Sequence, residues 1–203
     1  MTPKALLSIA LLMGFLSDGR ADEYFFRPIV SSVNPHVIAG ASATGLGFCT
    51  GLYMGTDEFG FEKEVSIEFE RAKWSGVETA PGQQFNVSET MMPIVLNLRA
   101  NFAPDSRYRK LRMYIGPCIG AASVNAKIKL TGGAQDQYAS NSDLDFAWGC
   151  TAGFLFHLDP RADIDIGYRV LGTSDTKFTL AGRSFSTGKY TMDGWYVGVG
   201  LRF

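Results

Sequence analysis

The sequence lacks the residue clusters from which metal centres and hydrolytic active sites are built. Its three cysteines, Cys49, Cys118 and Cys150, form no CxxC pair, and no histidine lies near them at a zinc-ligand spacing. Its two histidines, His36 and His157, have no serine beside them that is placed to act as a nucleophile. We therefore expect no metal, no cofactor and no enzymatic activity. Two of the thiols could pair in an exported protein, and the sequence leaves open whether Cys49 and Cys118 meet.

An excess of charge of either sign is also missing. The chain has 203 residues with 19 Lys and Arg against 20 Asp and Glu, a formal net charge of -1, and a charged fraction of 19%. This balance gives no reason to expect nucleic acid as a partner. The length suits one domain, and the 23 glycines and 15 phenylalanines favour β structure with close backbone contacts.

Long apolar runs are confined to the first residues of the chain. Lys4 precedes a short apolar stretch at 5–16, and the sequence GRA at 19–21 forms a small-x-small cleavage site. This pattern predicts a signal peptide over residues 1–21 and a mature domain over residues 22–203, outside the cytoplasm. No later segment has the roughly 20 uninterrupted apolar residues that a transmembrane helix needs. A membrane-spanning form of this chain must therefore be a closed barrel, because an open sheet leaves backbone groups unpaired in lipid.

Helical periodicity is hard to find after residue 21. Apolar and polar residues instead alternate repeatedly between clusters of Gly, Asn, Asp and Pro. The mature chain is therefore predicted to be all-β, with about eight antiparallel strands. The predicted strands cover residues 24–33, 45–55, 63–74, 87–102, 110–126, 143–158, 162–172 and 190–203.

The connections between the predicted strands alternate in length. The links TDEFGFE, APDSRYR and DPR are short, whereas SGVETAPGQQF, KIKLTGGAQDQYASNS and TSDTKFTLAGRSFSTGK are long. Short turns at one rim and long loops at the other are typical of an up-and-down membrane barrel with both termini at the short-turn rim. The long segments are predicted to be polar surface loops that could contact a ligand.

Every strand has one apolar and one mixed face, and the question is which face points outward. On the sixth predicted strand Phe146, Trp148 and Phe154 share a face that carries no charge, while the other face mixes Asp143 and Asp145 with small residues. An apolar face without charges and a charged face padded with glycine favour apolar side chains facing lipid. Aromatic residues near the predicted strand ends are expected to form the interfacial girdles: Trp74, Phe102, Phe156, Trp195 and Phe203.

The face predicted to line the lumen carries charges of both signs. An eight-stranded barrel is just wide enough for its side chains to fill, and an unpaired buried charge costs several kcal/mol. We therefore predict a structural network of ion pairs in preference to a conducting pore. Its members are Arg27, Glu64, Glu68, Glu70, Arg99, Arg112, Asp163, Asp165, Arg169 and Arg202.

The chain ends in GWYVGVGLRF, with Trp195, Val197, Val199, Leu201 and Phe203 on alternate positions. This stretch resembles the C-terminal assembly signal of bacterial outer-membrane barrels. The whole mature chain resembles the small outer-membrane barrels of the OmpA and OmpX type. The resemblance implies an integral protein of the outer membrane of a double-membraned bacterium, in contact with membrane lipid and lipopolysaccharide. It also implies recognition of the C-terminal strand by the barrel-assembly machinery.

Two other functions stay open at this point. A narrow porin-like channel for small solutes would use the same barrel with a wet lumen. A secreted, soluble, lipocalin-like barrel would bind a hydrophobic ligand, but it would need Trp148 and Trp195 to face inward, and the chain lacks the Gly-x-Trp signature near its first strand. Against these, the first interpretation is a barrel with a plugged lumen and a structural or surface-interaction role.

Overall fold

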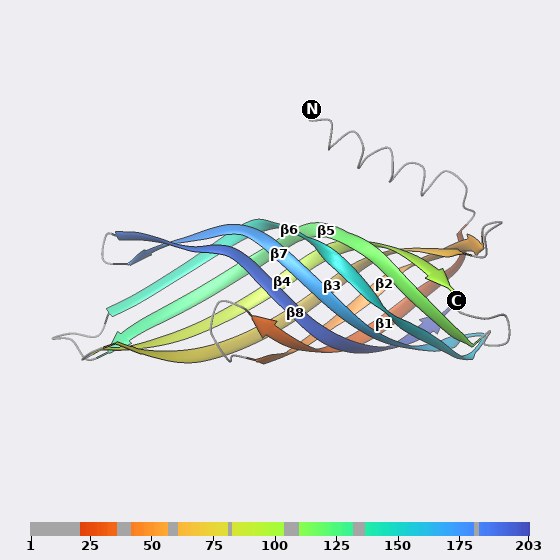
Figure 1. The fold of residues 1–203 in the computed structure, drawn as a ribbon, viewed down its shortest axis with the longest axis horizontal. Helices are drawn as coiled ribbons and strands as arrows, with labels where there is room; N and C mark the ends of the chain where they lie inside the picture. The colour runs from red at the N-terminus through yellow and green to blue at the C-terminus, as the bar shows by residue number, and fades with distance from the viewer. Residues whose placement is uncertain are drawn as a thin grey trace, which may run out of the picture.

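The computed structural model describes residues 21–35, 42–56, 61–80, 83–103, 110–131, 137–180 and 183–203. Within these ranges, eight antiparallel strands pair in sequence order, and β1 pairs with β8 to close the barrel (Figure 1). The predicted all-β, up-and-down fold is therefore confirmed. The strands are β1 (Ala21–Pro35), β2 (Ala43–Thr56), β3 (Glu62–Ala80), β4 (Gln83–Phe102), β5 (Leu111–Thr131), β6 (Gln137–Asp159), β7 (Ala162–Leu180) and β8 (Arg183–Arg202).

In the described part of the chain, no helix has the length and apolar character needed to cross a bilayer. The predicted signal peptide lies outside the described residues. At the other end of the chain, the backbone N–H of Arg202 donates to the carbonyl of Arg161 at 2.9 Å. The last strand therefore ends at the rim that carries the short turn between β6 and β7, on the right in Figure 1.

The three long connections were wrongly predicted to be loops, because most of their residues extend the strands. The pairing of β5 with β6 continues as far as Leu130 and Gln137, and that of β7 with β8 as far as Leu180 and Arg183. In Figure 1 these extensions reach the left end, beyond β1 and β2. Backbone pairing stabilises such ribbons even where both faces meet water, and a ribbon of that kind needs no apolar alternation. The hydrophobic pattern of the three long connections therefore did not indicate that they form strands.

The strands are staggered around the barrel. Following paired residues from Phe25 on β1 through every strand leads back to Pro35, ten positions farther along β1 (35 minus 25). This stagger tilts the strands against the barrel axis, and the small number of strands keeps the barrel narrow. Side chains that lie far apart in the sequence therefore meet across the lumen.

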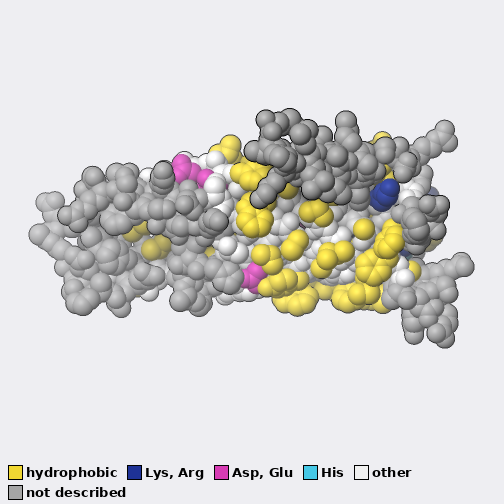
Figure 2. Space-filling view, turned by 45° about the horizontal axis from the view of Figure 1, so that its top comes forward, with side chains coloured by type: hydrophobic (Ala, Val, Ile, Leu, Met, Phe, Trp, Pro, Cys, Tyr) yellow, Lys and Arg dark blue, Asp and Glu magenta, His cyan; other side chains and the backbone are white. Residues whose placement is uncertain are grey.

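The apolar faces point outward, as predicted from the absence of charge on the apolar face and the glycines on the charged face. On β6 Phe146 is 59% and Trp148 54% exposed, whereas Ala147 between them is fully buried. Figure 2 shows hydrophobic side chains spread over the centre and right of the molecule, with few charges among them. A soluble barrel would need these aromatic side chains inside, so this arrangement excludes the lipocalin-like alternative.

Trp74 is the exception among the predicted girdle residues. It is only 2% exposed, and its indole Nε1–H donates to Glu89 Oε2 at 2.8 Å inside the barrel. The prediction was wrong because it used proximity to a predicted strand end rather than parity. Trp74 shares its parity with the inward-facing Glu70, and β3 continues past it to Ala80.

Candidate functional site

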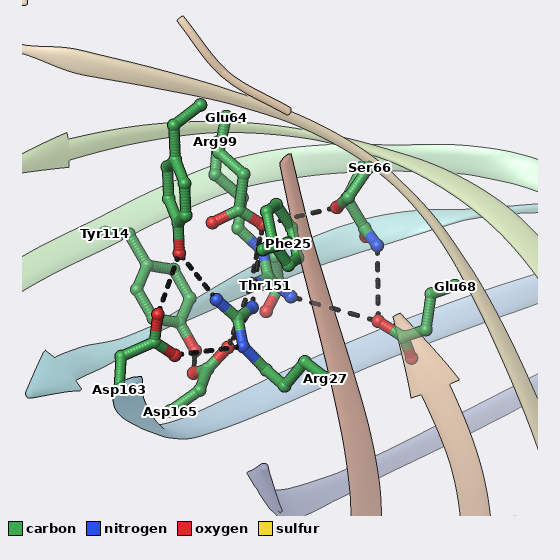
Figure 3. A network of polar contacts seen from close by, with 12 residues as sticks. Phe25, Arg27, Glu64, Ser66, Glu68, Arg99, Tyr114, Thr151, Asp163 and Asp165 are labelled. Carbon is green, nitrogen blue, oxygen red and sulfur yellow. Dashed lines mark hydrogen bonds and ion pairs between the residues drawn. The ribbon is translucent and has the colours of Figure 1, made fainter. Parts of the chain in front are cut away.

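The buried carboxylate of Asp165 on β7 is the point where the polar interior converges. Arg27 Nη1 on β1 lies 2.7 Å from Asp165 Oδ2, and Arg99 Nη1 on β4 lies 3.0 Å from the same oxygen. Tyr114 on β5 donates its hydroxyl to Asp165 Oδ1 at 2.5 Å. Figure 3 shows these side chains reaching one another from separate strands. Four strands are thus joined across the lumen through one carboxylate.

Two more carboxylates neutralise the central arginines. Glu64 Oε1 lies 3.2 Å from Arg99 Nη1, and Asp163 Oδ1 lies 3.4 Å from Arg27 Nε. Three carboxylates facing two guanidinium groups would leave an excess negative charge. Arg202 removes it, because its Nε lies 3.1 Å from Asp163 Oδ2. A buried group of charges that balances in this way avoids the penalty of an unpaired ion.

Two tyrosines close the space beside Arg99. Residues Tyr114, Gly153, Gly167 and Tyr196 pair in one row across β5 to β8, with the two glycines between the tyrosines. The tyrosine hydroxyls meet at 2.5 Å. Arg99 Nη2 donates to Tyr196 Oη at 3.1 Å, and the Arg99 guanidinium lies 4.8 Å from the centre of the Tyr114 ring. The glycines are required because a Cβ at Gly167 would overlap both hydroxyls.

A second charged group lies nearer the outer end of the lumen. Arg169 forms ion pairs with Glu68 and Glu70, and Ser31 donates to Glu70 Oε1 at 2.6 Å. Asn97 Nδ2 donates to Glu68 Oε2 at 3.2 Å. These groups are nearly inaccessible to solvent, so they fill the lumen rather than line a wide path.

The rim that carries the C-terminus has a third, more exposed group. Arg202 Nη1 lies 3.2 Å from Glu23 Oε2, and Arg202 Nη2 lies 2.6 Å from His157 Nδ1. Arg112 pairs with Glu62 at the same end. The side chains of Arg112 and Arg202 are 23% and 12% exposed, respectively, so water reaches the entrance of the lumen but not the arginines farther in.

An apolar layer fills the outer half of the lumen above the charged groups. Its members belong to the inward faces of all strands except β2, which contributes only the partly buried Ala43 at its edge. Met91 and Leu171 are completely buried. The buried members are Val33, Ala72, Trp74, Met91, Val95, Cys118, Ala122, Val124, Ala147, Leu171 and Met192.

The cysteines do not pair in this arrangement. Cys118 belongs to the outer apolar layer, whereas Cys49 belongs to a separate buried cluster with Phe25 and Tyr53, and Cys150 is exposed. All three are free thiols. Among the described residues, no group of three His, Cys, Asp or Glu side chains is arranged to hold a metal ion.

The structure places all of the predicted lumen charges on the inward face, each within 4.0 Å of an oppositely charged partner. The sequence analysis did not assign a role in this network to Tyr53, Glu62, Tyr114, Thr151 or Tyr196. The parity of Tyr114 opposite inward glycines could have identified it. The apolar layer was also missed, because apolar residues were assigned to lipid.

The sequence matches the profile of a family described as outer membrane protein beta-barrel domain over residues 14–203. A comparison with curated proteins finds no similar sequence. Among solved structures, Ail of Yersinia pestis is similar with a TM-score of 0.50 and 16% identity, covering 89% of this chain and 97% of that chain.

Two other solved structures are similar to this chain over nearly their whole length. Neisserial surface protein A has a TM-score of 0.46 and 14% identity over 89% of this chain and 96% of its own. OprG of Pseudomonas aeruginosa has a TM-score of 0.49 and 14% identity over 92% of this chain and 98% of its own. The family profile spans nearly the whole chain, and the barrel has its apolar face outside. The chain therefore belongs to the outer membrane protein beta-barrel domain family, and it is an integral barrel of the outer membrane.

Proposed function

We propose that the lumen is closed to solutes and that the protein acts as a rigid, non-enzymatic scaffold that presents its outward and extracellular surfaces for interaction. The observation that carries this proposal is the convergence of the buried Arg27 and Arg99 on Asp165 at the centre of the lumen. A solute would have to break these contacts to pass.

The energetics favour closure over conduction. Separating a buried ion pair leaves an uncompensated charge, at a cost of about 3–5 kcal/mol. Beyond the ion pairs, a solute would also meet the apolar layer around Met91 and Leu171, where ions and small polar molecules would lose most of their hydration. Two barriers of different chemistry thus lie in series.

The surroundings of His157 support the non-enzymatic part of the proposal. Both of its ring nitrogens lie within 3.4 Å of Arg202 Nη2, at the rim of the lumen. A general base needs a free nitrogen aimed at a nucleophile, and this ring is instead held against a cation.

Planar-bilayer recording of the purified barrel tests closure. We expect no steady conductance from the wild type, nor from Glu68→Ala, which should mainly lower the unfolding temperature. Ile67→Ala on the outward face of the same strand is the matched control. Steady wild-type conductance with an ion selectivity that changes in Glu68→Ala would overturn the proposal in favour of the narrow channel.

The outward apolar side chains, such as Phe146, Trp148, Ile166 and Val197, form a belt around the barrel that we call the apolar band. The surface role is supported by the described part of the strand extensions beyond this band, which offers a broad polar face. The Ail structure was determined with the heparin analogue sucrose octasulfate. That ligand belongs to Ail, and it makes a sulfated glycan a candidate to test on this chain. A pull-down with immobilised sulfated glycan, at physiological salt, would reveal such binding.

A further inference from the structure

Four basic side chains follow the outward faces of β3 and β5 where these strands leave the apolar band. On β3 the outward residues run from Ile67 and Phe69 directly into Arg71 and Lys73. On β5 the outward Lys127 and Lys129 occupy the extension. Arg71, Lys73 and Lys127 are exposed. The first basic residue thus lies at the edge of the apolar surface, where lipid head groups begin.

Among the described side chains of β3 to β5, no carboxylate lies on the same outward face as these basic residues. The outward positions of the described strand extensions nearby carry only hydroxyl, amide and small or apolar side chains. They are Ser75 and Val77 on β3, Gln84, Asn86, Ser88, Thr90 and Met92 on β4, and Ala121, Ser123, Asn125 and Thr131 on β5. On the other side of the barrel, β8 places the acidic Asp193 just above Trp195. Among the described side chains at this end of the barrel, exposed positive charge is found on β3 and β5.

The register brings the basic residues of β3 and β5 into one patch. Lys73 pairs with Thr90, and the next outward residue, Ser75, lies in a row with Ser88 and Lys127. Neighbouring strands lie about 4.8 Å apart, so Lys127 is about 10 Å from Ser75. Long flexible side chains on both strands can therefore reach one anionic group.

A hollow of about 600 Å³ lies against the same extensions of β3 to β6. Its lining includes Lys127 and Lys129 together with Ser75, Asn86, Ser88 and Tyr138. Lys129 Nζ lies 5.4 Å from the centre of the Tyr138 ring. Cations, hydroxyls, an amide and an aromatic ring are the groups that bind phosphorylated sugars.

We propose that Arg71, Lys73 and Lys127 bind the phosphate groups of the glycolipid in the outer leaflet, lipopolysaccharide, and thereby fix one side of the barrel against that lipid. The charge sign, the position at the band edge and the hydroxyl-rich surroundings fit a phosphorylated sugar attached to a membrane anchor. The proposal depends on the outer-membrane placement of the barrel and not on closure of its lumen.

Binding of purified lipopolysaccharide to the refolded, detergent-solubilised barrel tests the proposal, for example by titration calorimetry. The triple variant Arg71→Gln, Lys73→Gln, Lys127→Gln should weaken binding at least about tenfold, since each basic residue at an anionic lipid surface contributes measurably. The control variant Lys110→Gln, Arg161→Gln removes two exposed cations at the opposite rim and should bind like the wild type. Equal unfolding temperatures will show that all variants fold.

Two further probes identify the ligand chemistry. Chemically dephosphorylated lipopolysaccharide should bind the wild type as weakly as the intact lipid binds the triple variant. Equal binding of intact and dephosphorylated lipid, or an unaffected triple variant, would overturn the proposal. Binding of a soluble sulfated oligosaccharide to these residues, without any binding of lipopolysaccharide, would also overturn it and assign the face to an extracellular glycan.

Discussion

At the scale of single residues, we expect the carboxylate of Asp165 to contribute most to the stability of the polar interior. It accepts contacts from Arg27, Arg99 and Tyr114, all of them buried. Asp165→Asn keeps the shape but removes the charge that faces two guanidinium groups. We expect the free energy of unfolding to fall by about 3–5 kcal/mol, measured by urea titration of the barrel in bilayers.

A suitable control for this variant is Asp159→Asn at the exposed C-terminal end of β6. Asp159 Oδ1 accepts the backbone N–H of Arg161 at 2.7 Å, and asparagine keeps that acceptor. Its stability should change by less than about 0.5 kcal/mol. If the two variants were equally stable, the central position of Asp165 in the network would be refuted.

Gly167 allows the two lumen tyrosines to approach each other. A Cβ at this position would overlap the hydroxyls of Tyr114 and Tyr196. Gly167→Ala should therefore destabilise the barrel by about 1–3 kcal/mol through overpacking. Gly172→Ala on the same strand meets only the outer edge of the Trp148 ring at 3.2 Å, where a side chain facing lipid can move. Thermal unfolding followed on unboiled gels should separate the two variants.

At the scale of the strand, the outward face of β7 tests the assignment to lipid. Ile166 lies between Ile164 and Tyr168 on the outward face of that strand, inside the apolar band, and Ser174 lies beyond the band. Ile166→Arg should lower stability by about 2–4 kcal/mol, whereas Ser174→Arg should cost at most about 1 kcal/mol. Unfolding titrations in liposomes give both values. Equal costs at the two positions would mean that the band edge is misplaced.

The C-terminal residue Phe203 allows a role in assembly to be tested separately from a role in stability. Phe203 is 77% exposed, while its backbone is paired with Tyr24 through N–H to carbonyl contacts at 2.9 and 3.3 Å. Phe203→Ala should therefore leave the stability of the refolded barrel nearly unchanged. If the assembly machinery reads the C-terminal ring, as we propose, the amount of folded barrel in cells should fall. Leu158→Ala, exposed at the same rim on β6, should leave that amount unchanged.

At the scale of the whole molecule, the ion pairs and the apolar layer act as two barriers in series. Trp74→Ala with Met91→Ala opens only the apolar layer, so we expect this double variant to stay closed in planar bilayers. Adding Glu68→Ala and Arg169→Ala removes a matched pair of opposite charges but leaves Arg27 and Arg99 against Asp165, so the quadruple variant should stay closed as well. Conductance in the first double variant would show that the ion pairs do not block passage.

Much of this architecture could be predicted from the sequence, and the predictions of an outer-membrane barrel and of its family resemblance are confirmed. Side chains in a strand alternate with a period of two, so the parity of Phe146 and Trp148 against Ala147 determines which face is apolar. The C-terminal stretch carried the resemblance. The signal peptide and the roles assigned to the lumen charges and to the assembly signal stay predictions.

The tertiary structure alone decided which side chains meet. Arg27 and Asp165 are 138 positions apart, and they touch only because the ten-residue stagger and the narrow closure bring β1 and β7 to the same level of the lumen. The alternation along a strand determines whether a side chain points inward, but not which side chain it meets across the barrel. For the same reason the sequence did not reveal the apolar layer around Met91, the inward Trp74, or the strand extensions, whose backbone pairing needs no hydrophobic pattern.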